Sequence, residues 1–206
     1  MLTVFHLSTS RSERVIWLME ELGLPYRVER LERQPNLQAP PELRAVHPLG
    51  RAPVIRDGEV VLAESGAIVD YVTRRHAGGR LSRGPGDPDF ADYLFWLHFA
   101  EGTLVSQMLR EWYVDLLVPD IDDHPVVRRL REGSVTQLAF VEGRLAQVPF
   151  FAGPEFTAAD IMMTFPFTTL GSFRSLDLSP YPAIRDYLAR IAGRPAYRRA
   201  MAIAAG

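Results

Sequence analysis

Gly50-Arg51-Ala52-Pro53-Val54-Ile55 is followed by an Asp57-Gly58 turn, by Val60-Val61-Leu62 and then by Ala63-Glu64-Ser65-Gly66-Ala67-Ile68. These residues are the most informative about the fold. Two short apolar runs about an Asp-Gly turn predict a β-hairpin, and an acid-hydroxyl pair then opens a helix. Pro53 stands at the entrance of the first run, where it donates no hydrogen bond to a sheet, and X-Pro is the common setting for a cis peptide bond. A cis bond would turn the Val54 backbone toward a ligand, while the helix N-terminus after Glu64 suits a carboxylate. We therefore expect two ends of one site for a short, extended, acidic peptide.

The composition excludes several classes of function. The chain has 206 residues, a net charge of −2 and 47% hydrophobic residues, which suits one large domain or two small ones and indicates no nucleic-acid surface. No apolar run reaches the roughly 18 residues of a membrane span, and no secretory signal is visible, so we expect a cytoplasmic protein without membrane or nucleic-acid partners. There is no cysteine, so any thiol must come from a bound small molecule. The five histidines lack zinc-site spacing, and we expect no metal.

The first part of the chain alternates strands and helices. An amphipathic helix begins near Val15 and ends at Gly23. The remaining elements expected around it are strands at 2–7, 26–31, 53–56 and 60–62 and helices at 41–46 and 65–75. Their order is βαβ and then ββα, so residues 1–77 form an α/β domain.

The rest of the chain contains no strand pattern. Residues 78–87 are rich in glycine, proline and polar groups, and we interpret them as a linker. Residues 88–206 are expected to form an all-α domain, with helices at 88–117, 124–147, 158–170, 181–191 and 195–203. Thr157 and Asp160 have the spacing of a capping box that starts the third of these helices, and Pro166 should kink it.

These features together resemble the glutathione transferase family. The segments 39–54 and 62–68 are similar to the branch found in bacteria and fungi, and 96–102 and 183–197 are similar to its helical domain. The resemblance covers nearly the whole chain. It implies a thioredoxin-like N-terminal domain that binds glutathione, an all-helical domain with a hydrophobic substrate pocket, and a homodimer.

The resemblance assigns the glutathione contacts. The Val54 backbone would pair with the cysteinyl backbone of glutathione, as in β-strand addition. Ser65 would bind the γ-glutamyl carboxylate and Glu64 its ammonium, while Arg51 is placed for the glycyl carboxylate. The other glutathione-binding candidates are Ala52, Pro53, Gln38, His47 and Arg11.

One hydroxyl at the head of the first helix is sufficient to ionise the glutathione thiol. Lowering a thiol pKa of about 8.5 by about 2 units requires about 2.7 kcal/mol, and one hydrogen bond to a charged group contributes about 1.5–3 kcal/mol. The turn at residues 8–12 offers four hydroxyls. We favour Ser10 as the catalytic residue, with Thr9 and Ser12 as alternatives. A competing interpretation is that Ser10 and Glu13 form a capping box instead.

The expected function is a glutathione transferase that attacks a hydrophobic electrophile or a peroxide, as in detoxification. Candidates for the electrophile pocket are Leu104, Met108 and Tyr113. Two alternatives stay open at this point: a glutathione-dependent disulfide-bond reductase, and a non-catalytic, transferase-like binding module.

Overall fold

A computed structural model describes all residues of the chain except 37, 118–120 and 122–123. The described residues form two compact units, one of Met1–Gly84 together with Ile191–Gly206 and one of Pro85–Arg190. The division falls inside the linker expected at 78–87. The segment 191–206 differs from the expectation, because it lies with the first unit rather than with the helical residues that precede it.

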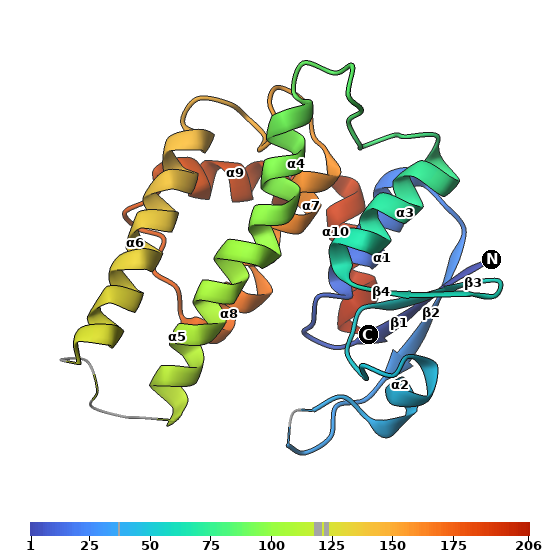
Figure 1. The fold of residues 1–206 in the computed structure, drawn as a ribbon. Coiled ribbons are helices and arrows are strands. Elements are labelled where there is room, and N and C mark those ends of the chain that lie inside the picture. Colours follow the sequence, from blue (N-terminus) through green and yellow to red (C-terminus); the bar gives the residue numbers. More distant parts are fainter. Residues whose placement is uncertain (37, 118–120, 122–123) are drawn as a thin grey trace. The chain divides into compact units, whose positions relative to one another are not determined.

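The first unit is built on a four-stranded mixed sheet (Figure 1). Its strands are β1 (Leu2–Leu7), β2 (Tyr26–Leu31), β3 (Val54–Asp57) and β4 (Val60–Ala63), in the spatial order β2-β1-β3-β4. Strand β2 runs parallel to β1, whereas β3 is antiparallel to both β1 and β4. With helices α1 (Glu13–Leu22), α2 (Pro41–Val46) and α3 (Ser65–Ala77), the chain order confirms the expected βαβ-ββα arrangement.

The two faces of the sheet are covered by different elements. Phe5 packs with Leu43 of α2 and with Val54 and Ala63. Side chains alternate between the faces of a strand, so His6 points to the opposite face from Phe5. On that face α1 packs against both α3 and α10 (Pro195–Ala205), as Figure 1 shows.

Helix α1 ends where the sequence predicts. Gly23 adopts a left-handed conformation, with φ 63°, and its N–H donates to the carbonyl of Met19. Glycine takes this conformation without steric penalty and is therefore the usual helix terminator.

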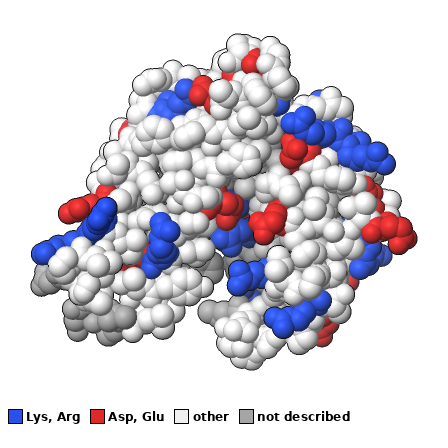
Figure 2. Space-filling model, in the orientation of Figure 1, with Lys and Arg blue, Asp and Glu red and all other residues white. Residues whose placement is uncertain are grey.

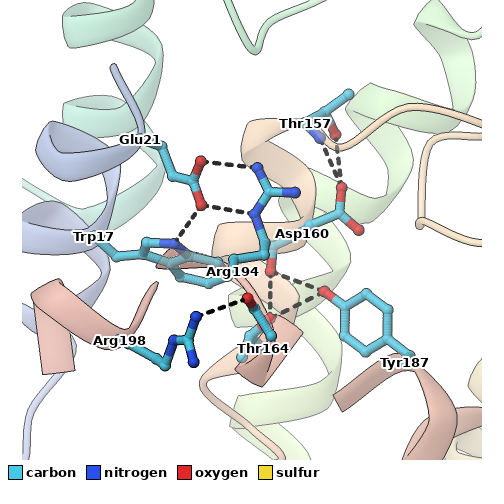
Figure 3. A network of polar contacts seen from close by, with 9 residues as sticks. Trp17, Glu21, Thr157, Asp160, Thr164, Tyr187, Arg194 and Arg198 are labelled. Atoms are coloured by element: carbon cyan, nitrogen blue, oxygen red, sulfur yellow. Dashed lines mark hydrogen bonds and ion pairs between the residues drawn. The ribbon is translucent and has the colours of Figure 1, made fainter. Parts of the chain in front are cut away.

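A polar network attaches α10 to α1 (Figure 3). The Arg194 guanidinium donates to both carboxylate oxygens of Glu21, at 2.7 and 2.8 Å, and the indole N–H of Trp17 donates to the same carboxylate at 2.9 Å. The ring of Tyr197 meets the ring of Trp17 edge to face, with centroids 4.8 Å apart. These contacts explain why the end of the chain belongs to the first unit.

The second unit contains helices α4 (Phe90–Phe99), α5 (Ser106–Leu117), α6 (Pro125–Leu145), α7 (Ala158–Thr164), α8 (Thr169–Arg174) and α9 (Pro182–Ala192, whose end extends into the first unit). The long helix expected at 88–117 contains a π-helical turn, η1 (Ala100–Val105), between α4 and α5. The Ser106 hydroxyl donates to the carbonyl of Glu101 at 2.7 Å within this region. The helix expected at 158–170 is split into α7 and α8 rather than kinked, because Pro166 has no N–H to continue the ladder.

The predicted capping box of α7 is confirmed. Asp160 accepts hydrogen bonds from the N–H of Thr157 at 2.8 Å and from its hydroxyl at 3.2 Å, and also from the N–H of Phe151 at 2.9 Å. Tyr187 donates to the Asp160 carbonyl at 3.2 Å (Figure 3). Burial raises the pKa of the Asp160 carboxyl to about 6, although these hydrogen bonds act in the opposite direction.

Within the described residues, no helix is long and apolar enough to cross a membrane. The same residues contain no group of three or more His, Asp or Glu side chains arranged to hold a metal ion. On the face drawn in Figure 2, basic and acidic side chains are interspersed, as is ordinary for a surface of small net charge.

Candidate functional site

One edge of the sheet gathers three segments that the sequence singled out. Phe5 is opposite Val54 in the antiparallel β1–β3 pair, so the end of β1, which leads into residues 8–12, lies at the same edge as the start of β3. Val54 is also opposite Ala63, which places Glu64 and Ser65 beside the entrance of β3. The strand register therefore brings the 8–12 turn, the Pro53 segment and the start of α3 together.

The Ala52–Pro53 peptide bond is cis, the conformation that the sequence made possible at this position. Pro53 and Val54 are buried, Ala52 is half-buried against the cluster around Phe5, and Arg51 is exposed just before them. The exposed Arg51 cation therefore directly precedes a buried segment, at the end of the sheet where β3 begins.

The start of α3 holds a buried hydroxyl without a partner. Ser65 is 3% exposed, and its Oγ has no hydrogen-bond partner among the described residues. Glu64 before it is exposed and has φ 72°, a region that non-glycine residues rarely occupy. Such backbone conformations persist where the surrounding structure imposes them, and they cluster at functional sites. A free hydroxyl at the N-terminus of a 13-residue helix is suited to an anionic group.

Ser10 and Ser12 are linked in the turn before α1. Their hydroxyl oxygens are 2.7 Å apart, and the Ser12 N–H donates to Ser10 Oγ at 3.2 Å. Ser10 is 9% exposed and Ser12 is fully buried. Helix α1 begins at Glu13 with Ser12 as its N-cap residue, and Ser12 makes no side-chain capping bond there. Of the two linked serines, Ser10 is the less deeply buried.

The two neighbours of Ser10 differ from it. Thr9 is exposed, with φ 49°, and its hydroxyl donates to the carbonyl of Ser8 at 2.7 Å. Arg11 is half-buried. Neither residue shares the buried position of Ser10.

Arg33 organises this turn and was not singled out from the sequence. Its guanidinium donates to the carbonyls of Ser8 and Thr9, at 3.0 and 3.1 Å. Leu31 is opposite Leu7 in the parallel β1–β2 pair, so Arg33 follows β2 at the level where the 8–12 turn follows β1. The parallel register of β1 and β2 is the feature from which the position of Arg33 could have been predicted.

His6 is the second residue that the sequence reading missed. The ring is 1% exposed and bridges Ser12 Oγ, at 2.8 Å from Nδ1, and the carbonyl of Ala204, at 3.0 Å from Nε2. Burial lowers the pKa of the imidazole below its ordinary value; the hydrogen bond to Ala204 acts in the opposite direction, and the charge of Arg30 adds to the lowering. No local sequence pattern predicts that His6 bridges Ser12 and Ala204, because Ala204 lies at the other end of the chain.

Gln38 and His47 lie in the segments that flank α2. Gln38 is exposed, and its N–H donates to the side chain of Asn36 at 3.0 Å. His47 is half-buried after α2, and its Nδ1 accepts from the N–H of Leu49 at 3.3 Å. Both residues have local roles in their loops, and their glutathione contacts stay predictions.

The candidates for the electrophile pocket lie in the second unit and differ in exposure. Leu104 and Met108 are 1% and 3% exposed, whereas Tyr113 is 52% exposed and packs on the ring of Trp112. Two of the three are therefore interior side chains in this structure, and their role in a pocket stays a prediction.

Comparison with known proteins identifies both parts of the chain. Residues 1–74 match the family model for the glutathione S-transferase N-terminal domain, and residues 108–195 match the model for the C-terminal domain. Glutathione S-transferase 3 of Schizosaccharomyces pombe is 32% identical over 213 residues, which cover 96% of this chain and 86% of the relative. The disulfide-bond oxidoreductase YfcG of Escherichia coli K12 is 27% identical over 210 residues, which cover 98% of this chain and 94% of the relative.

Solved structures share the fold. A glutathione S-transferase from Actinobacillus pleuropneumoniae has a TM-score of 0.89 and 30% sequence identity, covering 100% of this chain and 94% of that one. A glutathione transferase family member from Pseudomonas fluorescens, solved with two glutathione bound, has a TM-score of 0.82 and 23% identity, covering 97% and 91% of the two chains. These likenesses agree with the expected thioredoxin-like domain followed by helices.

Proposed function

Because the chain belongs to the glutathione S-transferase family, we propose that it binds glutathione at the sheet edge formed by β1, β3 and the start of α3 and activates its thiol. Glutathione carries a carboxylate at each end and a thiol in the middle. In this proposal the N-terminus of α3 at Ser65 receives the γ-glutamyl carboxylate, Arg51 the glycyl carboxylate and the Ser10 hydroxyl the thiol, while the Val54 backbone pairs with the cysteinyl backbone.

The unpartnered Ser65 hydroxyl is the observation that carries the proposal. A buried polar group without a hydrogen bond is unfavourable by about 1–3 kcal/mol, and the Ser65 Oγ is such a group at the N-terminus of α3. The γ-glutamyl carboxylate would accept its hydrogen and benefit from the helix dipole. Glu64, the exposed residue before Ser65, would bind the γ-glutamyl ammonium. Arg51, exposed two residues before Pro53, would bind the glycyl carboxylate.

Ser10 activates the thiol in this proposal. Only a thiolate is a good nucleophile, and a hydroxyl that donates to it stabilises its charge by about 1.5–3 kcal/mol. Ser10 is 9% exposed, whereas Thr9 is exposed and its hydroxyl donates to the carbonyl of Ser8. The thiolate then attacks a hydrophobic electrophile or a peroxide, as in detoxification by a cytoplasmic homodimer.

Glutathione titration followed by calorimetry, thiolate absorbance near 240 nm, and conjugation of a chlorodinitrobenzene test the proposal together. We expect the wild-type protein to bind glutathione and to lower its thiol pKa. Ser10→Ala should raise the pKa of the bound thiol by about 1–2 units, the equivalent of one hydrogen bond to a charged group. Thr9→Ala is the matched control and should leave that pKa unchanged. Absence of glutathione binding, or equal pKa values for wild type and Ser10→Ala, would contradict the scheme.

Reduction of disulfides is the second candidate function. The likeness to YfcG, whose name describes a disulfide-bond oxidoreductase, favours this function. Because the chain has no cysteine, the thiol that exchanges with the disulfide would be that of glutathione. Both functions require the same glutathione site. Reduction of the mixed disulfide of glutathione and 2-mercaptoethanol, measured beside conjugation, separates them, because a reductase should turn over the disulfide much faster than the chlorodinitrobenzene.

A further inference from the structure

A chain of hydrogen bonds runs from the turn before α1 to the C-terminal helix. It links Ser10, Ser12, His6 and the carbonyl of Ala204, with heavy-atom distances of 2.7, 2.8 and 3.0 Å in that order. All four residues belong to the first unit, and the three side chains are at most 9% exposed. With so little water in reach, each hydrogen in the chain has few possible acceptors.

The directions of these hydrogens follow from the chemistry of the groups. A carbonyl oxygen only accepts, so His6 Nε2 carries the hydrogen that is donated to Ala204. In the neutral imidazole Nδ1 is then an acceptor, and burial favours this neutral form. The Ser12 hydroxyl is the donor that reaches Nδ1, at 2.8 Å. Its contact with the carbonyl of Leu7 is longer, at 3.3 Å, and would leave Nδ1 buried without a donor.

Because the Ser12 hydrogen is donated to His6, Ser12 Oγ can only accept hydrogen bonds from its other neighbours. It accepts from the N–H of Leu7 at 3.2 Å and from the Ser10 hydroxyl at 2.7 Å. Ser10 in turn accepts from the N–H of Ser12 at 3.2 Å. In this series of hydrogen bonds, the Ser10 hydrogen is therefore the one that can be donated to a ligand at the sheet edge.

We propose that His6 is a positioning residue, which binds the Ser12 hydrogen so that Ser12 acts only as an acceptor and Ser10 is the sole hydroxyl of the pair that donates to the ligand. This inference rests on the proposed function for the identity of the ligand, but the hydrogen directions belong to the ligand-free protein. In the ligand-free state the Ser10 hydrogen points to Ser12, and it must leave that bond to reach a thiolate. His6 thereby limits how strongly the turn stabilises the thiolate.

The imidazole tautomer tests the proposal without glutathione. Nitrogen-15 NMR of the labelled, ligand-free protein should show a pyrrole-type Nε2 and a pyridine-type Nδ1 for His6. Ser12→Ala should move the Nδ1 resonance toward that of a pyridine-type nitrogen without a hydrogen bond. A hydrogen on Nδ1 in the wild-type protein would overturn the proposal, whatever the protein binds.

The second test measures the thiol pKa of bound glutathione. His6→Gln retains a donor that reaches the Ala204 carbonyl but has no polar atom at the Nδ1 position, so the Ser12 hydrogen is released toward Ser10. The pKa of the bound thiol should then fall by about half to one unit, the equivalent of one neutral hydrogen bond. In the Ser12→Ala background, His6→Gln should produce no further change, because His6 acts through Ser12.

A matched control separates this effect from general loosening of α10. Arg199→Gln removes the ion pair of Arg199 with Glu20, at 2.8 Å between α10 and α1, without touching the hydrogen-bond chain. It should leave the pKa of the bound thiol unchanged. An unchanged or raised thiol pKa in His6→Gln, or an equal shift in Arg199→Gln, would overturn the proposal. Failure of the wild-type protein to bind glutathione would instead contradict the proposed function, and the tautomer measurement would still decide the role of His6.

Discussion

Ser65 and Ser12 are both buried hydroxyls at the start of a helix, but their hydrogen bonds differ. Ser12 Oγ contacts His6 and accepts from the N–H of Leu7, whereas Ser65 Oγ has no partner among the described residues. A hydroxyl with partners supports the fold, while a buried one without partners is unfavourable until a ligand supplies the acceptor. At the scale of single residues, the hydrogen bonds and not the residue type separate structural serines from a binding serine.

This difference predicts opposite effects for two similar substitutions. Ser65→Ala should weaken glutathione binding by about 10- to 100-fold, since it removes one hydrogen bond to a charged group, and it should leave the unfolding free energy unchanged or slightly raised. Ser12→Ala should lower the unfolding free energy by about 1–3 kcal/mol, because it leaves the N–H of Leu7 and Nδ1 of His6 buried without a partner. Calorimetric titration and urea denaturation of both variants measure the two quantities. A clear loss of stability in Ser65→Ala would mean that its hydroxyl has a structural partner.

At the scale of elements, the N-terminus of helix α7 is capped by the fully buried carboxyl group of Asp160. Burial raises the pKa of Asp160 to about 6, above the ordinary value of 3.8. A raised folded-state pKa favours the protonated form, so this contribution to stability is present below about pH 4 and is lost as the pH rises through 6. The carboxylate nevertheless accepts from Thr157 and Phe151, which is why the box still caps the helix when it is ionised.

Asp160→Asn should remove this pH dependence. The unfolding free energy of the wild-type protein, minus that of the variant, is expected to fall between pH 4 and pH 7, with a slope of at most about 1.4 kcal/mol per pH unit. Urea denaturation at several pH values gives both curves. A difference that stays flat over this range would show that the carboxyl keeps its ordinary pKa in the folded protein.

The attachment of α10 to α1 also belongs to the scale of elements. Arg194 and Glu21 are 28% and 9% exposed, and their bidentate bond is shared with Trp17. Arg194→Ala should therefore lower the unfolding free energy by about 1–3 kcal/mol, since it leaves a largely buried carboxylate with fewer partners. The control is Arg74→Ala, because the Arg74–Asp70 pair is 51% and 43% exposed and is expected to contribute less than about 1 kcal/mol. Equal losses in thermal or urea denaturation would contradict the assignment.

At the scale of the whole molecule, the two ends of the chain form one unit. Residues 1–84 and 191–206 fold together, although more than half of the chain lies between them in sequence. Removal of 191–206 would expose the face of α1 that carries Trp17 and would take the Ala204 carbonyl away from His6. The C-terminal helix is thus part of the glutathione-binding unit in our proposal.

A fragment of residues 1–84 should be unable to fold cooperatively, whereas the same fragment joined to 191–206 by a flexible glycine-serine linker should unfold in a single transition. Circular dichroism during urea denaturation distinguishes the two cases. The Arg194→Ala change in the linked fragment is the control, and it should lower the midpoint of the transition. Cooperative unfolding of residues 1–84 alone would show that α10 is dispensable.

Local patterns in the sequence determined much of this protein. The hairpin about Asp57-Gly58, the helix end at Gly23, the setting for a cis bond at Pro53 and the Thr157–Asp160 capping box all depend on residues within a few positions of one another. Their order was sufficient to predict the βαβ-ββα arrangement, the helices after it and the family. Interactions of this range are encoded by spacing and side-chain chemistry, so they can be read without a fold.

The contacts that join residues far apart in the sequence depend on the folded chain as a whole. The bond of His6 to Ala204 spans 198 positions, and that of Arg194 to Glu21 spans 173. Arg33 reaches the turn of Ser8 and Thr9 through the pairing of two strands, and the Ser65 hydroxyl is without a partner only because of what packs around it. No local periodicity carries such contacts, since they arise from which faces the chain buries against each other once it has folded.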